Sequence, residues 1–127
     1  MNENEIGKII VKSAVTLHRE LGSGLLESVY EVILAHELEK CGLAVERQVS
    51  IPIEYHGISF PEGFRADIIV DQKVIIELKS VETINKSHKK QLLTYIQLAD
   101  YKLGYLLNFG EALMRDGIHR IINGTIS

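Results

Sequence analysis

The chain has 127 residues, enough to bury the core of one domain and too few for two. With 46% hydrophobic and 24% charged residues, its composition is that of a globular protein and excludes a disordered or fibrous one. The net charge of −3 gives no overall attraction to nucleic acid, so any such contact must be local. No run approaches the roughly 20 apolar residues of a membrane helix, and the acidic start differs from a secretory signal, so we expect a cytoplasmic protein.

Two helices are predicted at the start of the chain. Apolar residues from Glu3 to Leu21 recur at spacings of three and four, which indicates an amphipathic helix with one buried face. After Gly22-Ser23-Gly24, a second helical pattern runs from Leu26 to Leu38 and stops at Cys41-Gly42, where glycine suits a left-handed cap. As the single cysteine, Cys41 can form neither an internal disulfide nor a zinc site alone, and we expect it to be a small buried hydrophobic residue.

Three strands are predicted next, as a meander. The first covers Val45 to Tyr55, where apolar residues alternate with mostly polar ones, and a turn follows at His56-Gly57. Its predicted buried face consists of Val49, Ile51, Ile53 and Tyr55. After an interruption at Pro61-Glu62-Gly63, β-branched runs predict two strands buried on both faces, Phe64 to Val70 and Val74 to Val81.

The last third of the chain predicts a further helix and two short strands. Helical spacing returns from Lys86 to Ala99, and Gly104 to Asn108 and Ile118 to Ile122 read as strands. Together the elements predict an α/β or α+β fold, with a mixed central sheet flanked by helices in a single domain over residues 1–127.

The residues most suggestive of chemistry lie on the two adjacent strands of the predicted hairpin. Glu77 and Lys79 are two apart and therefore point to the same face. A two-residue turn would pair Asp67 with Ile76, away from the face of Glu77, whereas the loop 71–73 would set Asp67 opposite Glu77 and Arg65 opposite Lys79. We therefore predict an odd-length loop or a bulge.

Two neighbouring carboxylates, Asp67 and Glu77, would repel each other in an apolar surround unless they share a proton or bind a cation. Oxygen-rich carboxylate sites suit Mg²⁺ or Mn²⁺. A simpler interpretation remains open, in which Glu77 pairs with Lys79 and Asp67 with Arg65 as ordinary ion pairs at a solvated sheet edge.

Two further sets of polar residues have both a functional and a structural interpretation. Glu27 begins the second helix with Tyr30 on the same side, and such a glutamate can simply cap the helix. Gln91 and Tyr95 share a face of the late helix beside its apolar stripe, where they could reach a neighbouring site or form a half-buried boundary.

The sequence resembles the GxxExxY family, and the match spans most of the chain in five ordered segments. The matching residues are Gly24, Glu27 and Tyr30; Gly63-Phe64-Arg65-Ala66-Asp67; Ile76-Glu77-Leu78-Lys79; His88 with Gln91-Leu92-Leu93 and Tyr95; and Leu106-Leu107-Asn108-Phe109-Gly110. That family is similar to the PD-(D/E)XK nucleases, although Ala66 stands where their motif has proline. The resemblance implies a restriction-endonuclease-like core, αβββαβ, with an extra N-terminal helix.

The resemblance also implies roles for individual residues. Asp67, Glu77 and Glu27 would bind Mg²⁺ or Mn²⁺, which reverses the capping interpretation of Glu27, and Lys79 would complete the catalytic set. The expected substrate-positioning residues are Gln91, Tyr95, Tyr30 and Arg65.

The implied activity is metal-dependent hydrolysis of phosphodiester bonds in nucleic acid, with DNA favoured over RNA, and a homo-oligomer is compatible with the sequence. Two alternatives stay open because a fold does not determine a function. One is a catalytically silent nuclease-like binding module, and the other is a structural partner in a larger complex.

Overall fold

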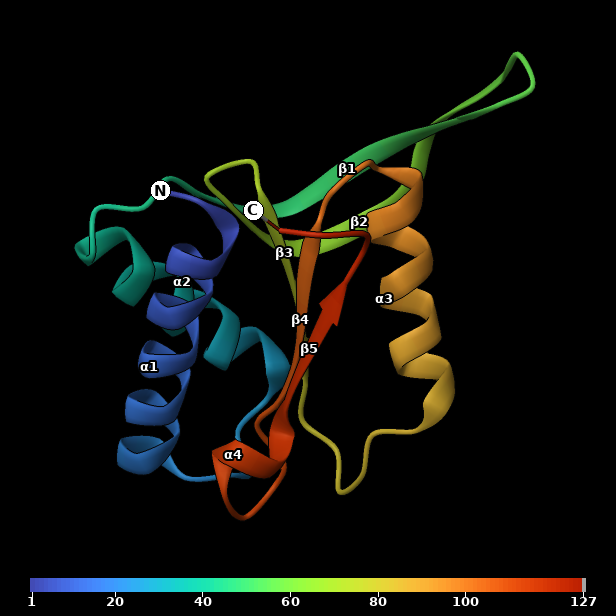
Figure 1. The fold of residues 1–127 in the computed structure, drawn as a ribbon. Coiled ribbons are helices and arrows are strands. Elements are labelled where there is room, and N and C mark those ends of the chain that lie inside the picture. The colour runs from blue at the N-terminus through green and yellow to red at the C-terminus, as the bar shows by residue number, and fades with distance from the viewer. Residues whose placement is uncertain (127) are drawn as a thin grey trace.

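The computed structural model describes residues 1–126 and arranges them around one five-stranded sheet with the order β1-β2-β3-β4-β5. In chain order the elements are α1 (Glu3–Leu21), α2 (Glu27–Lys40), β1 (Val45–Tyr55), β2 (Ile58–Val70), β3 (Val74–Lys79), α3 (Lys86–Leu98), β4 (Leu103–Asn108), α4 (Met114–Gly117) and β5 (Ile118–Ile122). Helices α1 and α2 cover one face of the sheet and α3 covers the other (Figure 1). The predicted mixed sheet with flanking helices is confirmed.

The first two helices agree with their predicted positions. Asn2 and Glu5 form a capping box at the start of α1, which satisfies two backbone N–H groups that the helix leaves free. Cys41 directly follows α2 but is exposed, so its predicted burial is wrong. The helical pattern ended there, and a residue at the end of a helix can face solvent.

The sheet is antiparallel except at its centre. Strands β3 and β4 run parallel, and the connection between them contains α3, as a parallel crossover requires. Apolar side chains alternate between the two faces of β3, where Ile76 packs with α1 and α2 while Ile75 packs with α3. The centre of the sheet is therefore buried on both faces, as its β-branched runs predicted.

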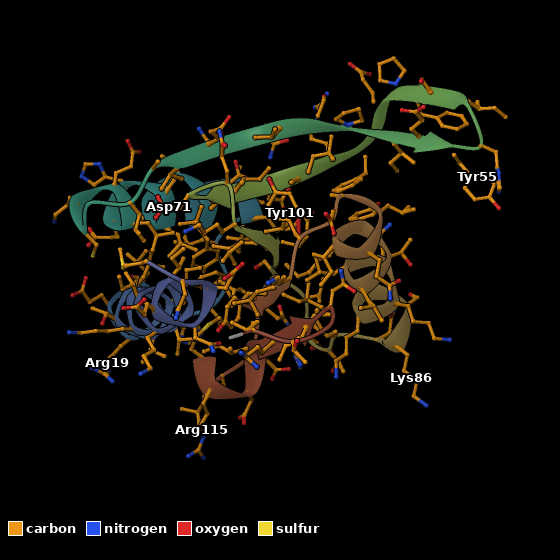
Figure 2. All side chains as sticks on the ribbon, turned by 45° about the horizontal axis from the view of Figure 1, so that its top comes forward. Arg19, Tyr55, Asp71, Lys86, Tyr101 and Arg115 are labelled. Atoms are coloured by element: carbon orange, nitrogen blue, oxygen red, sulfur yellow. The ribbon has the colours of Figure 1, made fainter. Side chains whose placement is uncertain are left out.

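The β1–β2 hairpin is longer than predicted. Strand β2 begins at Ile58 and continues through 61–63, where an interruption was expected, because the register shifts by two residues between Ile51 and Ile53. Pro61 is tolerated there because an irregular pairing needs no N–H from it. The outer half of the hairpin projects beyond the helices (Figure 1), and Tyr55 near its tip is 61% exposed (Figure 2). The predicted burial of Tyr55 is therefore wrong.

Asn108, at the end of β4, holds the chain that leaves β3. Its Oδ1 accepts hydrogen bonds from the Val81 and Gly110 N–H groups at 3.0 and 3.1 Å, and its Nδ2 donates to the Val81 carbonyl at 2.9 Å. A Cβ on Gly110 would lie 2.2 Å from the Val81 carbonyl oxygen, so only glycine fits. Strand β3 consequently ends at Lys79, two residues before the predicted end.

We expect Asn108→Ala to lower the free energy of unfolding by about 3 kcal/mol, because it removes three buried hydrogen bonds of about 1 kcal/mol each. Urea denaturation monitored by circular dichroism would measure this. Asn123→Ala is the matched control, because the Asn123 side chain donates one hydrogen bond, to the Tyr101 carbonyl, and its loss should cost about 1 kcal/mol. Equal losses in the two variants would contradict the assigned role of Asn108.

Candidate metal centre

Asp67 lies at the point where β2 and β3 separate. The two strands pair through Val70 with Val74, Ile69 with Ile75 and Ile68 with Ile76, across a three-residue connection. The next step of this register sets Asp67 across from Glu77, which confirms the predicted odd-length loop. Backbone pairing stops there, and Asp67 Oδ2 instead accepts a hydrogen bond from the Leu78 N–H at 2.9 Å.

Glu77 has a largely buried carboxyl group beside that of Asp67. Its Oε1 atom is inaccessible to solvent and has no hydrogen-bond partner among residues 1–126. Burial, and then the neighbouring charge of Asp67, raises the pKa of Glu77 from 4.5 to about 9. At neutral pH the side chain therefore holds a proton.

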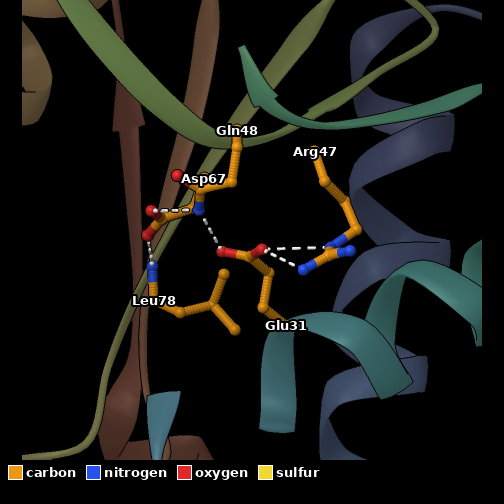
Figure 3. A network of polar contacts seen from close by, with 5 residues as sticks. All are labelled: Glu31, Arg47, Gln48, Asp67 and Leu78. Atoms are coloured by element: carbon orange, nitrogen blue, oxygen red, sulfur yellow. Dashed lines mark hydrogen bonds and ion pairs between the residues drawn. The ribbon is translucent and has the colours of Figure 1, made fainter. Parts of the chain in front are cut away.

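An ion pair between a buried glutamate and an exposed arginine adjoins this acidic centre, and the patterns in the sequence do not single it out. Glu31, 5% exposed on α2, accepts hydrogen bonds from Arg47 and from Gln48 on β1 (Figure 3). Gln48 also donates to Asp67 Oδ1 at 3.4 Å. The available signal for Glu31 was its position one helical turn after Glu27.

A pocket of about 590 Å³ opens over these groups between α2 and the diverging strands. Its lining consists of Leu26, Glu27, Ser28, Glu31, Arg47, Gln48, Asp67, Glu77, Leu78 and Lys79. Glu27 is exposed at its rim, and no side chain caps the start of α2. Across the described part of the chain, no three His, Cys, Asp or Glu side chains are already grouped to hold a metal ion. The expected trio of Asp67, Glu77 and Glu27 shares a pocket but is not preassembled.

Tyr30 does not face this pocket as a substrate-positioning residue would. Its ring is completely buried and stacks on Phe109, with the ring centroids 4.5 Å apart. Its hydroxyl donates to the Gly22 carbonyl at 2.6 Å and accepts from the Leu25 N–H at 3.2 Å. The expectation of substrate contact is thus corrected: Tyr30 holds the loop that leads into α2.

Arg65 and Lys79 are not opposite each other, contrary to the expected register. Arg65 is exposed and pairs with Ser50 on β1, because β2 has already separated from β3 at this level. Within residues 1–126, Lys79 forms no ion pair with Glu77, nor Arg65 with Asp67. The simpler interpretation of the motif as two ordinary ion pairs is therefore wrong.

Tyr95 approaches Glu77 from the α3 side of the sheet. Its ring stacks on Phe64 with centroids 3.9 Å apart. Partial burial, and then the charge of Glu77, raises the pKa of the Tyr95 hydroxyl, so the two groups interact. Gln91 is exposed one helical turn earlier on α3, outside the pocket lining.

This combination of a mixed sheet, flanking helices and two carboxyl groups where the central strands diverge defines a restriction-endonuclease-like protein. A sequence model of the PD-(D/E)XK nuclease superfamily matches residues 4–121, and the chain therefore belongs to that superfamily. Nucleases of this superfamily generally use divalent metal ions and act on nucleic acid. No curated protein matches the chain well enough to count as a relative. No helix within residues 1–126 is long and apolar enough to cross a membrane.

We expect Glu77→Gln to stabilise the metal-free protein increasingly as pH rises. The folded pKa of about 9 exceeds the ordinary value of 4.5, so the stability that the protonated wild-type group contributes is complete below pH 4.5 and is lost as pH rises toward 9. The loss is at most about 1.4 kcal/mol per pH unit, and an amide does not titrate. Urea denaturation in EDTA at several pH values would show the divergence. If Glu82→Gln, at an exposed position, changed the pH dependence of stability in the same way, the effect could not be assigned to the raised pKa of Glu77.

Proposed function

We propose that this protein is a metal-dependent nuclease that hydrolyses phosphodiester bonds, with Asp67 and Glu77 as metal ligands. The observation that carries the proposal is the buried Glu77 Oε1, which lacks a hydrogen-bond partner within residues 1–126 and lies beside a second carboxylate. A divalent cation would compensate both groups, and carboxylate oxygens suit Mg²⁺ or Mn²⁺. Membership of a nuclease superfamily supports the same conclusion.

The surrounding residues suit a phosphate group at this centre. A bound divalent cation would supply a water of lowered pKa and neutralise charge on the phosphate. Lys79 lines the pocket and makes no ion pair within the described residues, so its ammonium group is free to stabilise negative charge. The N–H groups at the uncapped start of α2 also favour an anion. Glu27, at the rim, is the third proposed ligand.

We also propose a closer assignment within the superfamily, to the GxxExxY family, with DNA favoured over RNA as substrate. Gly24 supports the assignment because its φ of +109° is one that other residues rarely adopt. In this proposal residues 1–127 form one nuclease domain, and Gln91 and Tyr95 contact the substrate from α3.

A catalytically silent binding module is the second candidate. The acidic side chains are not grouped as a three-ligand site anywhere in residues 1–126, and the net charge is −3. Such a module would bind nucleic acid or a protein without cleaving a phosphodiester bond.

Cleavage of mixed DNA and RNA substrates with Mg²⁺ or Mn²⁺ separates the two candidates. We expect wild-type cleavage, and a loss on the order of 10²-fold or more in each of Asp67→Asn, Glu77→Gln and Lys79→Ala. The first two substitutions remove proposed metal ligands, and the third removes a positive charge near the reacting phosphate. Glu82→Gln should retain wild-type activity, since this exposed residue lies outside the pocket. Undiminished cleavage by purified Glu77→Gln would overturn the nuclease proposal, and nucleic-acid binding without cleavage by wild type would establish the binding module.

For Tyr95→Phe we expect about a tenfold loss of cleavage with little change in the melting temperature. The substitution keeps the ring stacked on Phe64 and removes only the hydroxyl near Glu77, the equivalent of one hydrogen bond of about 1.4 kcal/mol. Tyr101→Phe is the control, because Tyr101 is also partly buried against the α3 side of the sheet, but burial and then the carboxylate of Glu46, not that of Glu77, raise the pKa of its hydroxyl. Full activity in Tyr95→Phe would show that the Tyr95 hydroxyl does not contribute to cleavage.

A further inference from the structure

Gln48 has an unusual backbone conformation where β1 passes Asp67. Its φ of +53° lies in the left-handed region, although the residue is inside β1 and is not glycine. The β1–β2 pairs pass from Arg47 with Ile68 to Val49 with Ala66, so Gln48 is the residue at the level of Asp67. Such strain persists only where surrounding interactions determine it, and it is common at functional sites.

The left-handed backbone at Gln48 places its side-chain amide between the carboxylates of Glu31 and Asp67. Its Nε2 donates to Glu31 Oε1 at 2.7 Å and to Asp67 Oδ1 at 3.4 Å (Figure 3). An amide can orient a carboxylate without neutralising it, whereas an arginine or lysine here would compete with a cation for Asp67. The charge of Asp67 thus stays available for a metal ion.

Glu31 acts as the anchor of this arrangement, meaning that it holds the Gln48 amide in place, and it is not a further metal ligand. Its Oε2 accepts a hydrogen bond from Arg47 Nε at 3.0 Å and forms an ion pair with Arg47 Nη2 at 2.8 Å, while its Oε1 accepts a hydrogen bond from Gln48. Both oxygens are therefore engaged, and the burial of Glu31 at 5% exposure excludes most of the competing water. The buried Glu31 carboxylate, held by Arg47, fixes the position of the Gln48 amide.

We propose that Gln48 is a positioning residue that fixes the Asp67 carboxylate in the orientation needed for metal binding, and that the Glu31–Arg47 pair holds it in place. Gln48 restrains Oδ1 and the Leu78 N–H restrains Oδ2, so rotation of the carboxylate is opposed at both oxygens. Partners that orient a metal ligand typically contribute 10- to 100-fold to metal affinity. This inference rests on the proposed metal site.

Titration calorimetry with Mn²⁺ on the full chain tests the proposal. We expect Gln48→Leu to bind Mn²⁺ at least about tenfold more weakly than wild type. Gln72→Leu is the matched control, because Gln72 is an exposed glutamine with the same φ of +53° in the turn after β2, outside the pocket. It should bind Mn²⁺ like wild type, and unfolding in EDTA shows whether both variants fold.

Gln48→Gly separates positioning from backbone strain. Glycine adopts the left-handed conformation without penalty but supplies no amide, so this variant should fold readily and still lose about tenfold in Mn²⁺ affinity. If the role of Gln48 were only structural, glycine would preserve binding. Wild-type affinity in Gln48→Gly would therefore overturn the proposal, whatever the stability of Gln48→Leu.

A double-mutant cycle with Glu31→Gln tests the anchor. We expect Glu31→Gln to weaken Mn²⁺ binding in the wild-type background and to have little further effect in the Gln48→Leu background, because both act through the same contact to Asp67. Additive losses would overturn the role of the anchor. If wild type binds no Mn²⁺, the proposed metal site fails and this inference with it. If wild type and both Gln48 variants bind equally, only the positioning role fails.

Discussion

The candidate site depends on one hydrogen bond, from the Leu78 N–H to Asp67 Oδ2. A backbone N–H at the centre of a sheet needs a partner, and β2 stops providing backbone partners for β3 beyond Ile68. A side-chain carboxylate therefore takes the position of a carbonyl and holds the strands apart. This places Asp67 beside Glu77 and opens the sheet to solvent on the α2 side, where the pocket lies.

The residues around this opening hold it in shape through contacts between distant parts of the chain. The Tyr30 ring stacks on Phe109, and the Tyr30 hydroxyl bonds the loop before α2. The adjacent Asn108 bonds the chain just after Lys79. Asn108 and Phe109, where β4 ends, thus set the positions of the α2 N-terminus and of the end of β3, and both of these segments line the pocket. Aromatic stacking and buried hydrogen bonds of this kind tolerate little displacement.

Local patterns in the sequence predicted the elements and the facing of Asp67 and Glu77, because periodicity and loop length determine which side chains share a face. They did not predict the long hairpin, since Pro61 signals a break unless the register shift that accommodates it is known. These patterns also did not predict the contribution of Gln48. It depends on a left-handed residue inside a strand and on contacts with Glu31, 17 positions away, and neither leaves a periodic signal.

The charges of the centre are balanced unevenly, and this imbalance supports the proposed metal site. Arg47 neutralises Glu31, and a proton neutralises Glu77, whose pKa is about 9. Asp67 has two neutral donors, the Gln48 amide and the Leu78 N–H, which stabilise its charge without cancelling it. The Asp67 charge and the Glu77 proton therefore lie side by side, and the ammonium group of Lys79 is the positive charge nearby. A divalent cation entering there would displace that proton and compensate both carboxylates together, which an amide or a single ammonium group cannot do.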